Sequence, residues 1–359
     1  AGGDFTSAGG AAASGIARWD GVQWSSLGGG LNAAVHCLIV HDDGSGPALF
    51  AGGAFTSAGG AAASAIARWN GANWTPLAGG MGGSFTPDVY ALAVYDDGAG
   101  PALYAGGDFL NANGVPAKHV ARWNGVGWSG LGTGTNGNVY ALAAFDAGEG
   151  SELHAAGDFG NAGGVAGVGR IARWNGLEWA KLAEANMQAD IFALTAFDDG
   201  TGPSLVAGGT FTTASGVAAN RIARWDGSSW SPLASGVGVV PGSAVRALIV
   251  AREADRETLI VGGEFAGTDF GDSFLATWSG CVDSRAPELA CPDQVRVVEA
   301  LAGPPGEVVH FDVEATDNFD PAPLVVCVPP SGSFFPSGAS LVTCTATDAS
   351  GTQSTCQFT

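Results

Sequence analysis

The chain has 359 residues and is 46% hydrophobic, which is enough for a large buried core and for more than one domain. Only 13% of the residues are charged, but 34 are acidic and 14 are basic, so the net charge is -20. Because nucleic acids and anionic membranes attract basic surfaces, this balance argues against both as partners. No apolar run reaches the roughly 18 residues of a spanning helix, so we expect no membrane insertion.

A pentapeptide recurs along most of the chain and divides it into repeats. The copies are AGGDF at 1–5, AGGAF at 51–55, AGGDF at 105–109, AAGDF at 155–159, AGGTF at 207–211 and VGGEF at 261–265. Their spacing is 50 to 54 residues, and each of the first five is followed by a second block such as IARWNGANW at 66–74. A period of this length is typical of proteins in which each repeat is one supersecondary unit.

Each repeat is expected to contain four antiparallel strands. Two alternating runs, Val89–Tyr95 and Ala102–Phe109, flank an Asp-Asp-Gly-Ala-Gly-Pro turn and form one hairpin. Asn70-Gly71 indicates a second hairpin with a two-residue type I′ turn.

The second hairpin has a predicted register. A two-residue turn pairs Trp69 with Ala72 and makes Trp69 and Trp74 diagonal neighbours on one face. Ile66 and Arg68 then point to the opposite face, since side chains alternate along a strand.

Four short antiparallel strands in about fifty residues is the pattern of a β-propeller blade. The repeat resembles the bacterial kelch-like propeller repeats of large secreted proteins, from residue 1 to about residue 281. It lacks the double-Gly and Tyr/Trp spacing of a standard kelch motif. The resemblance implies an all-β, six-blade-type propeller over residues 1–281.

Tryptophan marks the second block of every repeat. Ten of the 11 Trp are paired positions of five copies, and Trp278 belongs to a degenerate sixth copy, LATWSG. The pairs are Trp19/Trp24, Trp69/Trp74, Trp123/Trp128, Trp174/Trp179 and Trp225/Trp230. Because they follow strand alternation beside a hairpin turn, we assign them to packing between blades in preference to ligand stacking.

The expected strands fall two short of six complete blades. The GGxF and ARW strands occur six times each, but the W..L strand and strands such as Val89–Tyr95 occur five times each. Either a longer natural N-terminus completes the ring, or a neighbouring molecule donates a strand to an open edge.

A different pattern begins after Cys281. Residues 282–286 are expected to be a linker and residues 287–359 a separate domain. Its motifs are Cys291-Pro292, ATDNFDP at 315–321, PPSGSFFPSG at 329–338, VTCTATDASG at 342–351 and Cys356-Gln357-Phe358. With these motifs the segment resembles the HYR (hyalin repeat) domain, an immunoglobulin-like β-sandwich. The resemblance implies an extracellular location and a role in adhesion or matrix assembly, without catalytic chemistry.

The six cysteines fit disulfides in an oxidising compartment better than metal binding. For a domain of the HYR type we expect Cys291–Cys356, which ties the first strand to the last, and Cys327–Cys344. Cys344–Cys356 is the rival pairing. Cys37 and Cys281 remain, and a bond between them that locks the ends of the propeller is an open alternative.

Four turns combine carboxylates with glycine, in HDDGSGP at 41–47, YDDGAGP at 95–101, FDAGEGS at 145–151 and FDDGTGP at 197–203. Calcium binds several oxygens in flexible geometry, so calcium is the one candidate cofactor. Its candidate ligands are Asp42, Asp43, Asp96, Asp97, Asp198 and Asp199. The competing interpretation, a hairpin loop that uses Asp and Gly for turn conformations, is favoured because each turn offers so few carboxylates. In either case the turns should make one mouth of the central channel negative.

The Asp of GGDF occurs as Asp4, Asp108 and Asp158, but the other copies carry Ala54, Thr210 and Glu264. A repeated binding site whose acidic side chain is missing from some copies is a weak candidate for a binding site. We expect these carboxylates to be buried partners of the ARW arginines, with solvent exposure at a strand end as the alternative.

Catalytic signatures are missing from the sequence. GxSxG, HExxH and P-loop motifs do not occur, and the five His, at 36, 41, 119, 154 and 310, have no ligand spacing. We expect each to be a surface or strand-filling histidine. Recognition is expected in variable loops, at Phe85, Asn113, Asn138 and Met187, because loops on a rigid scaffold carry function.

Together these patterns predict a secreted, non-enzymatic structural or adhesive protein. It would self-assemble through strand edges into a filament or surface layer, with copies of itself or other extracellular proteins and glycans as partners. The alternative is a monomeric propeller that binds carbohydrate or protein outside the cell, with the C-terminal domain as a spacer. A hydrolase or lyase at the acidic mouth of the channel is a third class, but no acid/base pair has the neighbouring groups that catalysis needs.

Overall fold

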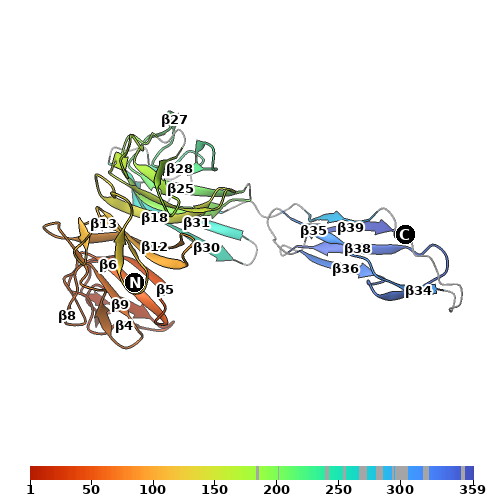
Figure 1. Cartoon of the computed structure of the whole chain (residues 1–359), viewed down its shortest axis with the longest axis horizontal. Coiled ribbons are helices and arrows are strands. Elements are labelled where there is room, and N and C mark those ends of the chain that lie inside the picture. The colour runs from red at the N-terminus through yellow and green to blue at the C-terminus, as the bar shows by residue number, and fades with distance from the viewer. Residues whose placement is uncertain are drawn as a thin grey trace. The chain divides into compact units, whose positions relative to one another are not determined.

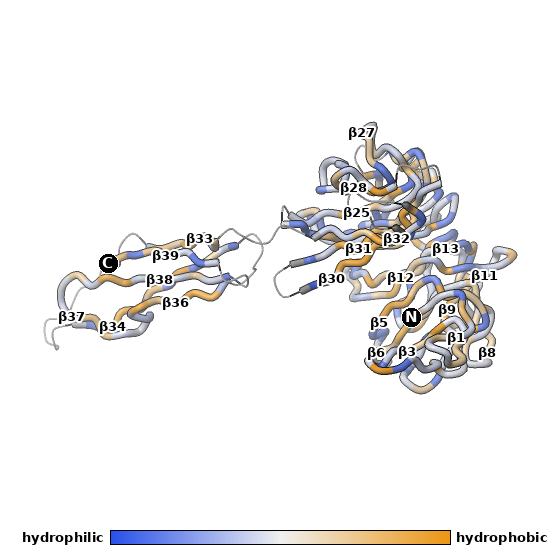
Figure 2. The backbone as a smooth tube through the Cα atoms, turned by 180° about the vertical axis from the view of Figure 1, so that it is seen from behind, coloured by the Kyte–Doolittle hydropathy of each residue, from blue (hydrophilic) through white to orange (hydrophobic). Residues whose placement is uncertain are grey.

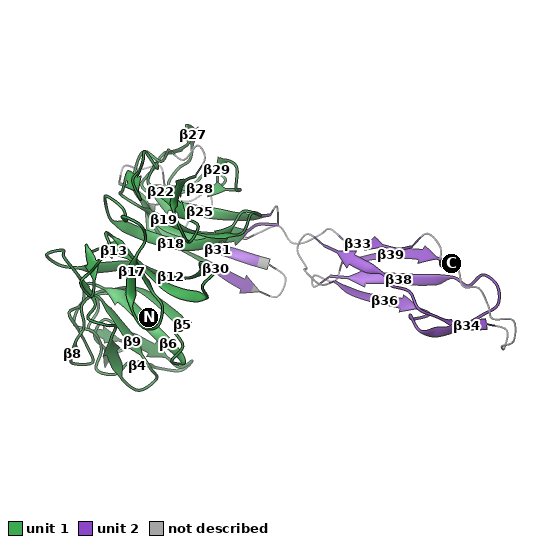
Figure 3. Ribbon diagram, viewed as in Figure 1, with its two compact units in different colours: residues 1–197, 203–249, 260–277 green, residues 198–202, 250–259, 278–359 purple. Residues whose placement is uncertain are grey.

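The computed structural model of the chain is built of β-strands (Figure 1). It describes residues 1–182, 186–200, 202–238, 242–253, 256–266, 273–279, 286–292, 295, 306–317, 323–348 and 352–359, and none of these residues is helical. Two compact units are present, the first made of residues 1–197, 203–249 and 260–277, and the second of 198–202, 250–259 and 278–359 (Figure 3). The described residues include no helix that could span a bilayer.

Four consecutive antiparallel sheets have four strands each and form propeller blades 2 to 5. Blade 2 contains β5 (Val35–Asp42), β6 (Pro47–Gly53), β9 (Ile66–Trp69) and β10 (Trp74–Pro76). Blade 3 contains β12 (Asp88–Asp96), β13 (Pro101–Asp108), β16 (Val120–Trp123) and β17 (Trp128–Gly130). Blade 4 contains β18 (Val139–Asp146), β19 (Ser151–Gly157), β22 (Ile171–Trp174) and β23 (Trp179–Lys181). Blade 5 contains β24 (Ile191–Asp198), β25 (Pro203–Gly209), β28 (Ile222–Trp225) and β29 (Trp230–Pro232).

Blades 1 and 6 have fewer strands among the described residues, in agreement with the strand count from the sequence. In blade 1, β3 (Ala17–Trp19) pairs with β4 (Trp24–Ser26), and Gly2 forms a single bridge to Ile16. Blade 6 has the order β30 (Ala244–Glu253), β31 (Arg256–Ala266), β32 (Ser273–Ser279). The first strands of successive blades are neighbours, as β5 and β12 are, and we call β5, β12, β18, β24 and β30 the inner strands.

Short two-residue strands occur in the connections between the GGxF and ARW strands, and β11 lies between blades 2 and 3. They are β1 (Ser7–Ala8), β2 (Ala11–Ala12), β7 (Ser57–Ala58), β8 (Ala61–Ala62), β11 (Met81–Gly82), β14 (Asn111–Ala112), β15 (Val115–Pro116), β20 (Asn161–Ala162), β21 (Val165–Ala166), β26 (Thr213–Ala214) and β27 (Val217–Ala218).

The paired glycines of GGxF are required by a close approach of backbone. A Cβ at Gly107 would collide with the carbonyl oxygen of Asp88, which leads into β12, and one at Gly157 would collide with that of Asn138. The same contact recurs at Gly209 with Asp190. Since only glycine lacks a Cβ, the second Gly of the motif lets each inner strand begin directly against its neighbour.

Each of these contacts is accompanied by a β-bulge. The register between the inner strand and its partner shifts between Val35 and Cys37, between Val89 and Ala91, and between Val139 and Ala141. His36, Tyr90 and Tyr140 are therefore the extra residues of the bulges. A bulge re-aims the side chain that it carries.

The hydrophobic core lies in layers between successive blades, and the strands carry most of the apolar residues (Figure 2). Between blades 2 and 3, Phe50 packs in one cluster with Leu103 and Phe109. The indole of Trp179 donates a 2.9 Å hydrogen bond to the carbonyl of Leu131 in the preceding blade, and Trp74 does the same with Leu27. The tryptophans therefore join neighbouring blades, as the sequence pattern predicts.

The tryptophans differ in how far they are buried. Seven are buried, namely Trp74, Trp123, Trp128, Trp174, Trp179, Trp225 and Trp230. Trp19, in blade 1, is 50% exposed. Trp24, Trp69 and Trp278 are half-buried.

The predicted two-residue turn at Asn70-Gly71 is wrong. Trp69 is directly opposite Trp74, and Arg68 is opposite Thr75, so the loop has four residues. The side-chain oxygen of Asn70 accepts hydrogen bonds from the backbone N–H groups of Ala72 and Asn73, which stabilises the longer loop. The two rings consequently lie side by side, 5.4 Å between centroids, and not diagonally.

The C-terminal part of the chain is an immunoglobulin-like sandwich of small sheets. β33 (Glu288–Ala290) pairs with β35 (Glu314–Thr316), and β34 (Gly306–Val309) pairs with β37 (Ser333–Pro336). The third sheet has the order β36 (Leu324–Val328), β38 (Val342–Thr347), β39 (Gln353–Phe358).

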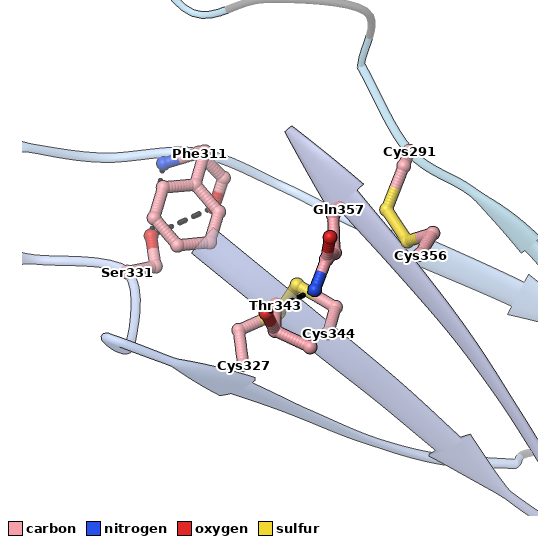
Figure 4. Close-up of a disulfide and its surroundings, with 8 residues drawn as sticks. All are labelled: Cys291, Phe311, Cys327, Ser331, Thr343, Cys344, Cys356 and Gln357. Carbon is pink, nitrogen blue, oxygen red and sulfur yellow. Dashed lines mark hydrogen bonds between the residues drawn. A yellow bond between two sulfur atoms is a disulfide. The ribbon is translucent and has the colours of Figure 1, made fainter. Parts of the chain in front are cut away.

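Two disulfides tie this sandwich together, Cys291–Cys356 and Cys327–Cys344 (Figure 4). They are the expected pairings, and the rival Cys344–Cys356 bond is not formed although these residues face each other on β38 and β39. Cys37 has a free thiol, so the alternative of a bond to Cys281 is not realised, and Cys281 and most of the expected linker 282–286 lie outside the described residues. The Cys37 thiol instead contacts the carbonyl oxygen of Val89 at 3.7 Å.

Replacing Gly107 with alanine tests the close approach. We expect Gly107→Ala to lower the free energy of unfolding by about 3 kcal/mol, because the new Cβ must displace the Asp88 carbonyl. Gly127→Ala is the matched control, since a Cβ there meets no atom within 4 Å, and it should change stability by less than about 0.5 kcal/mol. Urea unfolding of both variants measures the difference, and equal midpoints would show that the carbonyl moves aside at little cost.

Candidate functional site

The acidic turns use their carboxylates to build the hairpins. The side chain of Asp96 accepts hydrogen bonds from the N–H groups of Gly98 and Gly100, at 2.9 and 3.0 Å. The same pair of bonds recurs at the first Asp of the other turns, Asp42, Asp146 and Asp198. This is the turn-forming role that competed with calcium binding in the sequence.

The second carboxylate of the turn pairs with the Arg of ARW. Asp97 lies 2.8 Å from Arg122 and accepts a 3.1 Å hydrogen bond from the hydroxyl of Tyr104. Burial raises the pKa of Asp97, but hydrogen bonds from Ala99 and Tyr104 and the charge of Arg122 outweigh it and hold the pKa below its usual value. In blade 4 Glu152 replaces it as the partner of Arg173, at 2.8 Å.

The expectation that the GGDF carboxylates pair with these arginines is therefore wrong. Arg68 lies 3.8 Å from Asp43, so the turn carboxylate has the role assigned to the GGDF position. The reason is the hairpin: Arg122 is opposite Tyr104 on the adjacent strand, on the side of the turn that holds Asp97. Among the described residues, no group of three or more His, Cys, Asp or Glu side chains could hold a metal ion.

The opposite ends of the inner strands carry a row of contacting side chains whose rings are tilted against one another. Ring centroids are 5.5 Å apart between His36 and Tyr90, 5.2 Å between Tyr90 and Tyr140, and 5.3 Å between Tyr140 and Phe192. The guanidinium of Arg246 then lies 4.3 Å from the centre of the Phe192 ring. We call these five residues the aromatic ladder. It runs without a break across blades 2 to 6.

Partial exposure distinguishes the ladder from its surroundings. The residue before each ladder position is buried, and Val89, Val139 and Ile191 are examples. Tyr90, Tyr140 and Phe192 are half-buried, while His36 and Arg246 are exposed. At His36, Tyr90 and Tyr140 the bulge turns the ring out of the buried layer, which explains how an apolar strand presents an accessible aromatic row.

Carboxylates accompany the ladder, and we call Asp88, Asp108, Asp158 and Glu264 the ladder carboxylates. Asp88 is paired with Asp108 across β12 and β13, and lies 3.2 Å from the imidazole of His36. The hydroxyl of Tyr140 donates a 3.0 Å hydrogen bond to Asp158. Glu264 pairs with Arg246 at 3.2 Å. Three of the four are therefore the acidic positions of GGDF and GGEF.

These negative charges perturb the tyrosines. Burial first, and then the charges of Asp88 and Asp108, raise the pKa of Tyr90 to about 12. Burial also raises the pKa of Tyr140, with the Asp158 charge adding to it. One buried oxygen of Asp88 and one of Asp158 have no hydrogen-bond partner among the described residues. The ladder thus lies in a negative field with free acceptor capacity.

Sequence reasoning missed the ladder. It treated His36 as a filler histidine and assigned recognition to loops, although the position after the first Val or Ile of the inner strand is His36, Tyr90, Tyr140, Phe192 and Arg246 in successive repeats. Aligning the repeats by that strand would have revealed the column.

The loop residues expected to bind ligand behave differently from one another. Phe85 is fully exposed at a loop tip, whereas Met187 is 3% exposed and belongs to the core between blades 4 and 5. The backbone N–H of Asn113 donates to the carbonyl of Gly80, and Asn138 contacts the hydroxyl of Tyr140 at 3.5 Å. Met187 is thus a packing residue, and Asn138 belongs to the surroundings of the ladder.

Comparison with known proteins identifies one family. Residues 282–359 match the HYR domain. No curated protein matches the chain.

Solved structures give distant likenesses. The extracellular domain of the hybrid two-component system BT4673 from B. thetaiotaomicron is 10% identical, with a TM-score of 0.43, over 74% of this chain and 30% of that one. A structure of BBS1N in complex with ARL6DN is 13% identical, with a TM-score of 0.33, over 89% and 90% of the two chains. The present chain spans less than a third of the length of the bacterial domain.

The contact between His36 and Asp88 can be tested by titration. The hydrogen bond to Asp88 raises the pKa of His36 above its usual value, so Asp88→Asn should lower it. Because the folded-state pKa exceeds the unfolded value of about 6.5, the pair stabilises the protein below that pH, and the contribution is lost as the pH rises through the folded-state pKa. NMR titration of the imidazole measures the shift.

His154 is the internal control for this titration. Its pKa is lowered by burial to about 4, and it should be the same in both proteins. A His36 pKa that Asp88→Asn leaves unchanged would contradict the assignment.

Proposed function

We propose that this protein is a secreted, non-enzymatic binding protein whose propeller recognises an extracellular ligand at the aromatic ladder. One observation carries the proposal: a partly exposed row of contacting side chains crosses five blades, and at three of its positions the strand has a bulge. Side chains that serve only packing are buried, as the tryptophans of blades 3 to 5 are. Partly exposed aromatic rings with carboxylates beside them are typical of recognition surfaces.

An extracellular location is supported by the C-terminal part of the chain. Residues 282–359 match the HYR domain, and its two disulfides require an oxidising compartment to form and persist. In this proposal the domain serves as an adhesive module or spacer that presents the propeller.

A binding role is favoured over a catalytic one by the partners of the acidic residues. The turn carboxylates are occupied by backbone N–H groups and by arginine, as Asp96 and Asp97 are. In the ladder, His36 is held by Asp88, and Tyr90 keeps its proton because its pKa is about 12. These groups suit recognition by hydrogen bonds and charge better than proton transfer near neutral pH.

Binding arrays test the proposal. The full chain is applied to arrays of extracellular peptides and glycans, together with a Tyr90→Ala/Tyr140→Ala variant. We expect the variant to lose the retained spots, because two rings in the middle of the ladder are gone. Phe85→Ala is the matched control, since it removes an exposed aromatic ring outside the ladder and should leave binding unchanged. Loss of binding with Phe85→Ala alone would place recognition in the loops.

Self-association is the second candidate, and β36 favours it. This strand lies at the edge of its sheet and exposes Leu324, Val326 and Val328, an apolar row that Figure 2 shows along the strand. No residue of β36, β38 or β39 is charged, in a chain with a net charge of -20. An uncharged apolar edge strand is where two copies of an acidic protein can pair with the least repulsion.

Charge at this edge should prevent assembly. We expect Val326→Lys to shift particles to monomers in light scattering over a concentration series, because lysine on an edge strand blocks strand pairing. Thr355→Lys, in the same cross-strand row but on β39, is the control that should leave the distribution unchanged. A wild-type chain that is monomeric at every concentration would contradict this candidate and leave the ladder proposal standing.

A further inference from the structure

We infer that the ligand of the ladder is a basic peptide segment, whose guanidinium or ammonium groups bind beside the rings and carboxylates of blades 3 and 4. This inference rests on the proposed function and names the chemical class of its ligand. Three features of the described residues support it: a cation of the chain itself bound to the ladder, equivalent carboxylates that have no arginine at the corresponding position in blades 3 and 4, and carboxylate and hydroxyl oxygens along the row.

The chain's own Arg246 shows what the ladder binds. Its guanidinium lies over the Phe192 ring at 4.3 Å and donates two hydrogen bonds to Glu264, at 3.2 and 3.4 Å. This arrangement combines a cation–π contact with a bidentate carboxylate, and both interactions are favourable for a guanidinium. It is exposed to solvent, so a ligand can reach the neighbouring positions.

The same arrangement recurs without a cation in blades 3 and 4. By position in the repeat, Asp108 and Asp158 correspond to Glu264. Asp158 accepts a hydrogen bond from Tyr140 and keeps one buried oxygen without a partner among the described residues. In blade 6 the cation comes from the chain, whereas in blades 3 and 4 tyrosine occupies the position of Arg246, so the ladder supplies no arginine to Asp108 and Asp158.

Basic groups of the chain compensate only part of this negative charge. Arg170 donates to the backbone carbonyl of Asp158, and its ion pair, at 4.0 Å, is with Asp190. His119 contacts the carbonyl of Gly107, and burial lowers its pKa, which keeps it neutral near pH 7. His36 is bound to Asp88 at the far end of the ladder.

The polar groups of the ladder favour a ligand that only donates hydrogen bonds over a neutral sugar. Neighbouring rings in the ladder are tilted against one another by 44° to 60°, with centroids 5.2 to 5.5 Å apart, so no flat platform of parallel rings is formed. The polar groups beside the rings include tyrosine hydroxyls and carboxylate oxygens. A guanidinium or ammonium group only donates hydrogen bonds and therefore fits such acceptors, whereas sugar hydroxyls need donors as well.

A peptide suits this row better than a single small cation. The acidic position is filled in blades 3, 4 and 6 along a continuous ladder, so more than one basic group on an extended chain can bind together. The net charge of -20 also attracts a basic partner over a distance.

Calorimetric titration of the full chain with a peptide of alternating arginine and glycine tests the inference. The matched ligand control is the same peptide with citrulline in place of arginine, which keeps the shape and removes the charge. We expect the arginine peptide to bind and the citrulline peptide to bind at least about tenfold more weakly, because charge-assisted hydrogen bonds are lost. Equal binding of the two peptides would overturn the inference.

Variants locate the binding site. Asp108→Asn/Asp158→Asn should weaken binding of the arginine peptide by about tenfold or more, and Asp108→Glu/Asp158→Glu should restore it, since Glu264 fills this position in blade 6. The control Glu149→Gln/Glu178→Gln removes the same charge from exposed hairpin loops away from the ladder and should change affinity by less than about twofold. If both neutralised pairs weaken binding equally, attraction follows net charge and the site is not at the ladder.

The outcomes separate this inference from the function on which it rests. If the arginine peptide does not bind but an array ligand is lost with Tyr90→Ala/Tyr140→Ala, the ladder binds a ligand of another class and only the inference fails. Spermidine that matches the arginine peptide in affinity would show that a single small amine suffices and would overturn the peptide assignment. Thermal unfolding of each variant shows whether the fold is kept, and the glutamate pair keeps the test valid if the asparagine pair is unstable.

Discussion

The structure of the propeller depends on one close contact between backbones. Where each inner strand begins, its leading carbonyl meets the second glycine of GGxF with no room for a Cβ, as Asp88 meets Gly107. The contact is coupled to a bulge one residue later, which turns out Tyr90 in blade 3. The motif that looks like a repeated loop signature therefore controls where the aromatic side chains point, and so connects the fold to the ladder.

Packing between blades makes the rest of the scaffold rigid. Each tryptophan pair lies on the outer hairpin of its blade, and Trp74 and Trp179 donate to carbonyls of the blade before them. The ARW arginines are held within their own blade, as Arg122 is by Asp97. Because these residues hold the scaffold together, we assign recognition to the less regular column at the start of the inner strands, the aromatic ladder.

Acidic residues divide into two sets with different environments. Carboxylates in the hairpin turns, such as Asp96, are saturated by backbone N–H groups and fix the loops. Carboxylates of the GGxF motif lie at the other end of the inner strands, beside the rings, and Asp158 keeps acceptor capacity. The two sets therefore differ in role, since the first fixes the loops and the second is the one that we propose for ligand binding.

The sequence alone determined the repeats, the strand composition of the blades and the packing role of the tryptophans, and it favoured the two disulfide pairings of the C-terminal domain over their rival. All of these follow from local alternation, turn chemistry or motif order, which are written within one repeat or domain. The loop length after Trp69, the partner of Arg122 and the aromatic ladder were decided by the tertiary structure. Tyr90 and Tyr140 are fifty residues apart in sequence and meet only because successive inner strands lie side by side, a relation that no single repeat contains.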